Sequence, residues 1–200
     1  NTGGQFYTAK NPEYGAVFTY NLNDVPKTSK SLRMQRERKL NTDNKDVPFP
    51  GYDKLADEMN EKPASIILTI KDSEGNHIRN IKKNASNGSS RIAWNLRHQS
   101  YYPIRAGRAQ ANSWFNPSGP YVTPGEYHAE IYLENNGSVE KLDGPIAFNV
   151  KPLRKGTLEG ASYNEYNSFR TRVSNLYVAM SKYQDEFNMM KSKIELLDKA

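Results

Sequence analysis

The C-terminal segment, residues 160–200, carries the pattern that most restricts the fold. Apolar or aromatic residues recur there at alternating steps of three and four positions, at Tyr166, Phe169, Val173, Leu176, Met180, Tyr183, Phe187, Met190, Ile194 and Leu197. This spacing matches a heptad seam, and no glycine or proline follows Gly160. The pattern therefore predicts one helix of about 35 residues, roughly 50 Å long.

The start of this helix is marked by Ser162 and Glu165. A serine followed three positions later by glutamate is a capping box, in which each side chain satisfies a backbone N–H of the other residue. We therefore expect the helix to begin directly after Ser162.

The apolar seam requires a second helix, because a lone amphipathic helix in water is marginally stable. We expect the partner helix to come from another copy of the chain or from residues beyond Ala200; the alternative is packing against the chain's own sheets. Four of the ten seam residues are Tyr or Phe, which favours an irregular antiparallel pair or a small bundle. The association helix is assigned to Phe169, Val173, Leu176, Met180, Phe187, Met190 and Ile194.

Strand patterns dominate the middle of the chain. Apolar residues alternate with others in Ala16–Leu22, around Ile66, Leu68 and Ile70, and in residues 91–97, 127–134 and 146–150. The inward-facing set is expected to be Ile92, Trp94, Leu96, Tyr127, Ala129, Ile131 and Leu133, whereas His128, Glu130 and Glu134 are expected to face outward. Ile146, Phe148 and Val150 complete the last strand, with Phe148 expected in the core. No helix pattern separates the strands after Pro63, so a parallel sheet is excluded and an antiparallel β-sandwich is predicted.

Turn signals support this arrangement. Asp72 to Gly75 predicts a hairpin between residues 65–70 and 77–81, residues 84–90 are expected to form a loop, and Asn136-Gly137 predicts a type I′ turn. Residues 26–62 form a helical insertion, with helices expected from Thr28 or Ser29 to Leu40 and from Asp53 to Asn60. We therefore predict a sandwich over 1–152, containing this insertion, and a helical segment over 153–200.

Composition and motifs exclude several classes of chemistry. The chain has no cysteine, which excludes disulfides and thiolate sites. Its histidines, His77, His98 and His128, lie in different segments, and nucleophile-elbow and phosphate-loop motifs are missing. No apolar run approaches the roughly 20 residues of a membrane-spanning helix. We therefore expect no catalytic residue, metal or cofactor in this chain, and no membrane span.

Two segments suggest alternative binding functions. The loop over 98–124 gathers aromatic residues that can stack on sugar rings, namely Tyr101, Tyr102, Trp114, Phe115 and Tyr121. A carbohydrate-binding module is therefore one alternative, and coverage of an open end of the sandwich by these rings is the structural alternative. Residues 71–108 carry eight Lys or Arg against Asp72 and Glu74, a surplus equal to the chain's net charge of +6. This basic region is the second alternative, polyanion binding; we expect no nucleic-acid partner.

The order of motifs resembles a known family. The run FYTAKNPEYGAVFTYNL is similar to the segment that follows the β-propeller in large secreted bacterial proteins of the sortilin-like, BNR-repeat, "glycosyl hydrolase-like" group. FPGYDKLADE, IILTIKDSEGNHIRNI, RIAWNLR and GPYVTPGEYHAEIYL follow in the same order. Residues 66–133 also resemble the Ig-like domain of flagellar hook-capping proteins.

This resemblance implies an Ig-like sandwich followed by a helical segment. It places any hydrolase activity in a propeller outside this chain and carries no catalytic residue onto it. The chain is thus expected to be a non-catalytic accessory domain, located outside the cytoplasm in the periplasm, at the cell surface or in the medium. Its expected partners are the propeller of the same polypeptide, a second copy of the chain and, in the alternative, a glycan.

Overall fold

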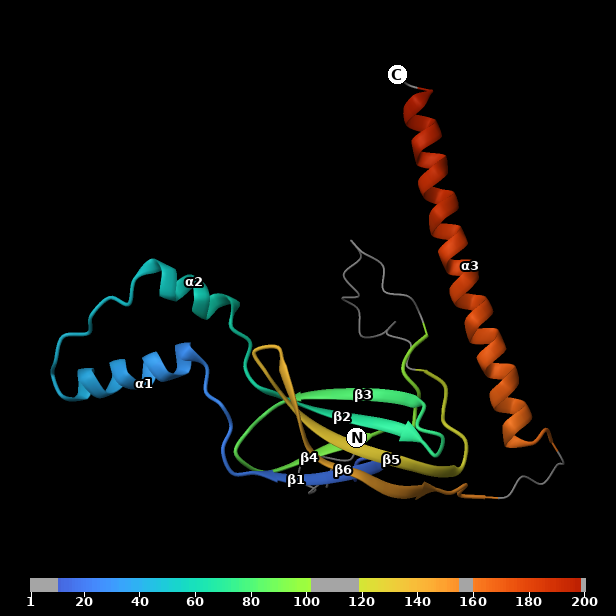
Figure 1. The fold of residues 1–200 in the computed structure, drawn as a ribbon, viewed down its shortest axis with the longest axis horizontal. Helices are drawn as coiled ribbons and strands as arrows, with labels where there is room; N and C mark the ends of the chain where they lie inside the picture. The colour runs from blue at the N-terminus through green and yellow to red at the C-terminus, as the bar shows by residue number, and fades with distance from the viewer. Residues whose placement is uncertain (1–10, 102–118, 155–159, 199–200) are drawn as a thin grey trace, which may run out of the picture. The chain divides into compact units, whose positions relative to one another are not determined.

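The computed structural model describes residues 11–101, 119–154 and 160–198, which form six strands and three helices (Figure 1). In chain order these are β1 (Ala16–Leu22), α1 (Ser29–Thr42), α2 (Tyr52–Asn60), β2 (Ser65–Asp72), β3 (His77–Asn84), β4 (Gly88–Trp94), β5 (Gly125–Asn135), β6 (Ser138–Val150) and α3 (Tyr163–Leu197). The contacts divide the chain into two units. One unit comprises residues 1–96 and 127–148, and the other comprises residues 97–126 and 149–200.

The six strands form two antiparallel sheets in a roughly sandwich-like arrangement. One sheet pairs β1 with β4, and the other has the order β3-β2-β5-β6. In the larger sheet Leu68 of β2 lies between Ile81 of β3 and Ile131 of β5. The antiparallel sheets and the long C-terminal helix confirm the coarse fold expected from the sequence.

The core of the first unit lies around Trp94, which is 0% exposed. Its indole meets Tyr127 edge-on at 5.5 Å and Phe148 at 5.9 Å between ring centroids, and Phe148 also contacts Phe18. Ile66, Leu68, Ile70 and Ile92 are buried with it. The alternation of these strands thus placed Trp94 correctly in the core.

The boundaries of β3 and β4 differ from the sequence expectation. Residues 84–90 were expected to be loop, but β3 extends to Asn84 and β4 begins at Gly88, opposite Leu22 of β1. The pairing of β1 with β4 ends at Trp94, so Leu96 lies outside the strand. Leu96 has a positive φ of 57° and is half-buried, so the prediction that it is an inward strand residue is wrong. The length of β1 therefore sets both ends of β4.

Strand β6 contributes the expected core residue Phe148. Phe148 and Val150 are partly buried, but Ile146 is 52% exposed. It follows the Gly144–Pro145 pair at the edge of the four-stranded sheet, where β6 has β5 as its neighbour. A side chain on an edge strand is covered from fewer directions, which accounts for the exposure of Ile146.

The helical insertion forms a linked pair. Thr28 caps α1 by accepting a hydrogen bond from Ser31 N, as the sequence predicted. The Arg33 guanidinium donates to Glu58 of α2 at 2.8 Å and to Glu37 at 2.6 Å. No described residue of α1 or α2 is buried, so polar contacts hold this pair together.

The β5–β6 turn requires a positive φ at both of its central residues. Asn136 and Gly137 have φ values of 49° and 82°, the positive pair that a type I′ turn requires, so this prediction is confirmed. Gly137→Val is expected to destabilise the sandwich by about 1–3 kcal/mol, because a β-branched residue resists positive φ. Urea unfolding measures the loss. Gly137→Asn, which tolerates this region, is the control; equal stability of the valine variant would contradict the turn assignment.

Candidate functional site

Helix α3 is the element with the clearest functional features. The Ser162 hydroxyl accepts a hydrogen bond from Glu165 N at 3.3 Å, and the Glu165 carboxylate accepts one from Ser162 N at 2.8 Å. These two bonds form the predicted capping box, and the Ser162 backbone lowers the pKa of Glu165. The helix then runs without interruption for 35 residues, as the seam spacing predicted.

The seam of α3 is exposed along its entire length. The exposed fractions of its ten residues run from 46% to 75%, with no buried member. The set is Tyr166, Phe169, Val173, Leu176, Met180, Tyr183, Phe187, Met190, Ile194 and Leu197. Within the unit of α3, the described residues therefore leave the seam uncovered, and packing on the chain's own sheets stays the alternative.

A different face of α3 is held by contacts within its own unit. The Asn167 amide donates to the Thr123 hydroxyl at 2.9 Å, and Arg170 donates to the Tyr121 carbonyl at 2.9 Å. The Tyr177 ring packs edge-on against Tyr101. Further along the same face, Ser181 is 8% exposed. The helix is thus held through polar contacts and the ring of Tyr177, which leaves the apolar seam uncovered within this unit.

The aromatic loop is described only in part. Tyr102, Trp114 and Phe115 lie outside the described residues. The ring of Tyr101 contacts Tyr177, and the Arg97 guanidinium lies 3.7 Å from the centroid of the Tyr121 ring. Both described tyrosines thus make intramolecular contacts, and the sugar-stacking hypothesis stays a prediction.

Several cations of the basic region have intramolecular partners among the described residues. Lys71 pairs with Glu130, Lys82 pairs with Glu134, and Lys83 donates to the Arg91 carbonyl. Arg79 donates to the Asn95 amide oxygen at 3.2 Å. Lys71 and Lys82 are thus paired with an opposite charge, whereas Lys83 and Arg79 bond to neutral oxygens, and polyanion binding stays a prediction.

Among the residues that the structure describes, Glu130 of β5 is the charged residue with the lowest exposure. The sequence predicted an outward side chain, but Glu130 is only 7% exposed. Lys141 donates to Oε1 at 2.8 Å, while Lys71 contacts Oε2 at 2.6 Å and Tyr132 donates to it at 2.8 Å. Glu130 thus lies on the outward face, opposite Ala129, but long polar side chains of neighbouring strands cover it.

These donors lower the pKa of Glu130 from 4.5 to about 2, with Lys141 the largest cause, followed by Lys71 and Tyr132. Because the folded-state pKa lies below the unfolded one, the stabilisation is present above pH 4.5 and is lost as the pH falls towards 2. At neutral pH, Glu130→Gln is expected to destabilise the sandwich by about 1–3 kcal/mol. This deficit should shrink below pH 4.5.

Urea unfolding at several pH values measures this effect. Glu134→Gln is the matched control, since Glu134 lies on the same strand and also pairs with a lysine, but in a more exposed position. We expect a smaller loss for this control. A Glu130→Gln deficit that is the same at pH 7 and pH 3 would contradict the assignment.

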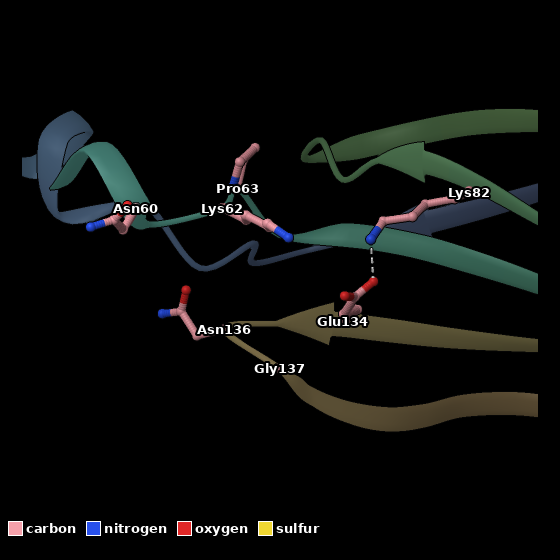
Figure 2. Close-up of a pocket in the computed structure, with 7 residues that line it drawn as sticks. All are labelled: Asn60, Lys62, Pro63, Lys82, Glu134, Asn136 and Gly137. Carbon is pink, nitrogen blue, oxygen red and sulfur yellow. Dashed lines mark hydrogen bonds and ion pairs between the residues drawn. The ribbon is translucent and has the colours of Figure 1, made fainter. Parts of the chain in front are cut away.

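A polar pocket of about 250 Å³ lies beside the start of β2 and the β5–β6 turn. Figure 2 shows the side chains of Lys82 and Glu134 pointing toward each other there, joined by the ion pair. Ser65 also donates to Glu134 at 3.2 Å. The other residues that line the pocket are Asn60, Lys62, Pro63, Asn136 and Gly137. The lining holds two lysines, Lys62 and Lys82, and one carboxylate, Glu134, so the pocket offers a polar surface with an excess of positive charge.

Two searches of the described residues gave negative results. No group of three or more His, Cys, Asp or Glu side chains is arranged to hold a metal ion among them. No described helix combines the length and the apolar character needed to cross a membrane.

Comparison with known proteins gave no match, since no family model, curated protein or solved structure is significantly similar to this chain.

Proposed function

We propose that this chain is a non-catalytic accessory domain that associates with a second copy of itself through α3. The observation that carries the proposal is the exposure of all ten seam residues, each at least 46% accessible, on a helix held through a different face. Exposed apolar surface of this extent and regularity is typical of an interaction site.

The size of the seam supports a stable association. At about 1 kcal/mol per residue, ten partly exposed residues correspond to roughly 10 kcal/mol of apolar burial when paired. Part of this gain offsets the entropy lost on association. Micromolar or tighter binding, about −8 kcal/mol or below, is therefore within reach of this surface.

The pattern of the seam supports a second copy as the partner. A helix with residues at alternating steps of three and four presents knobs and holes that a helix of the same spacing fits. Because one surface serves both partners, the resulting dimer can close with twofold symmetry.

The wider setting of the domain is also a proposal. We propose that the sandwich is Ig-like and belongs to a secreted protein with a β-propeller, which the order of sequence motifs supports. Translating the encoding reading frame upstream of Asn1 tests this. Propeller blades with Asp-box repeats would support the proposal, whereas an unrelated upstream sequence would contradict it.

Thermal unfolding tests the association. The helical signal at 222 nm in circular dichroism is followed for the 200-residue chain over a hundredfold range of concentration. Since association stabilises the native state by mass action, the melting temperature of α3 is expected to rise with concentration. A helix melting temperature independent of concentration would contradict the proposal.

A further inference from the structure

We infer that the two α3 helices pair parallel and in register, with their C-terminal halves joined by ion pairs that flank the seam. This inference rests on the proposed association and adds the orientation of the partner. It comes from the charges beside the seam and from the contacts that already occupy one flank.

The charges lie at the flanking positions of the heptad. Glu186 and Lys193 directly precede the seam residues Phe187 and Ile194, and Lys191 and Asp198 directly follow Met190 and Leu197. In a parallel, in-register pair, a flanking residue such as Glu186 or Lys193 lies beside the residue five positions later on the partner helix. Glu186 then meets Lys191 of the partner helix, and Lys193 meets Asp198. Both matches are between opposite charges, and symmetry makes each of them twice.

The N-terminal half of α3 has one flank occupied. Arg170 holds the Tyr121 carbonyl at 2.9 Å and lies 2.7 Å from the His98 ring nitrogen, and Tyr177 packs on Tyr101. Both residues occupy the same heptad position as Lys191 and Asp198. The intramolecular contacts of α3 therefore use this flank near its start, and the charges near its end remain exposed to a partner.

The charges of the C-terminal half are only weakly engaged within the helix. Lys182 lies 3.9 Å from Glu186, and Lys191 lies 4.0 Å from Glu195, with all four side chains at least 42% exposed. Asp198 stands at the C-terminal end of α3, where the helix dipole disfavours a negative charge. Lys193 of a parallel partner would offset this charge.

An antiparallel pair uses different contacts. In an antiparallel pair, residues that precede the seam positions face each other, and residues that follow them face each other. Glu186 then does not meet Lys191, and Lys193 does not meet Asp198, across the seam. The bulk of the Tyr and Phe residues alone favours the antiparallel pair expected from the sequence. The arrangement of charges favours the parallel one.

Disulfide trapping tests the orientation, because the chain has no cysteine of its own. Leu176→Cys and Met190→Cys each place one thiol in the seam, and Ser192→Cys places one on the opposite side of the helix as the control. Each variant is incubated with oxidised glutathione as the oxidant and resolved on a non-reducing gel. A parallel, in-register pair brings each seam cysteine to its own copy, so both seam variants should form covalent dimers and the control should not.

The two seam positions together exclude the alternative. They lie 14 residues apart, about 21 Å along the helix, so no single antiparallel register brings both to their own copies. Dimers in solution with one or neither variant trapped would overturn the parallel inference and leave the association intact. A wild-type chain that is monomeric would overturn the proposed function itself.

A charge swap gives an independent readout. Glu186→Lys is expected to weaken dimerisation by about tenfold, because it turns two attractive pairs into repulsive ones. Adding Lys191→Glu should restore binding. Since both substitutions also break the pairs within the helix, Lys182–Glu186 and Lys191–Glu195, restoration cannot come from those. A double variant weaker than the single one would contradict the parallel pair.

Discussion

Trp94→Ala is expected to destabilise the sandwich by about 3–5 kcal/mol. Trp94 is fully buried, and its ring lies edge-on to Tyr127 and Phe148, which come from the other sheet. Removing the indole leaves a cavity between the two sheets that these aromatic rings cannot fill without moving. The free energy of unfolding, measured by urea titration with circular dichroism at a strand wavelength, reports the loss.

Val139→Ala provides the comparison for this experiment. Val139 lies on β6 and is 57% exposed, so its truncation should change the free energy of unfolding by about 0.5 kcal/mol or less. A Trp94→Ala protein that melts within a degree or two of the wild type would show that Trp94 does not organise the core.

The second large effect is expected at the seam of α3. Leu176→Glu combined with Phe187→Glu should weaken self-association at least about a thousandfold, some 4 kcal/mol, because a dimer would bury four uncompensated carboxylates. Glutamate is a good helix former, so α3 should remain helical where its other contacts hold it. Size-exclusion chromatography with light scattering should show a soluble monomer whose sandwich remains folded.

Val178→Glu is the matched control for Leu176→Glu. Both change an exposed apolar residue of α3 to glutamate, but Val178 lies off the seam. The control should dimerise within a few-fold of the wild type. Equal loss in both variants would show that added charge, and not the seam, disrupts association.

Local periodicity predicted the elements that depend on local rules. The 35-residue length of α3 followed from the seam spacing, and its start followed from Ser162 and Glu165. The positive φ values at Asn136 and Gly137 followed from the turn chemistry of that pair. The burial of Trp94 followed from strand alternation. Each of these features is set by residues a few positions apart.

The errors arose where distant residues decide the outcome. Glu130 does face away from Ala129, but Lys71 and Lys141 from neighbouring strands enclose it. Leu96 falls outside the ladder because β1 pairs with β4 only up to Trp94. Periodicity within one strand contains no information about the reach of side chains on its neighbours.

The contacts that hold α3 could not be predicted from the sequence either. The seam indicated which face is apolar, but the contacts that hold the helix come from Thr123 and the Tyr121 carbonyl, more than forty residues away. Polar and small residues at helical spacing give no strong signal in a sequence. The exposure of the seam therefore emerged from the structure.

Sedimentation equilibrium of the 200-residue chain tests the central claim most directly. If the seam of α3 binds a second copy, the chain should sediment with twice its monomer mass at about 50 μM. This concentration is well above the roughly micromolar dissociation constant expected for the seam. A chain that sediments as a monomer at this concentration, with α3 folded, would contradict the account.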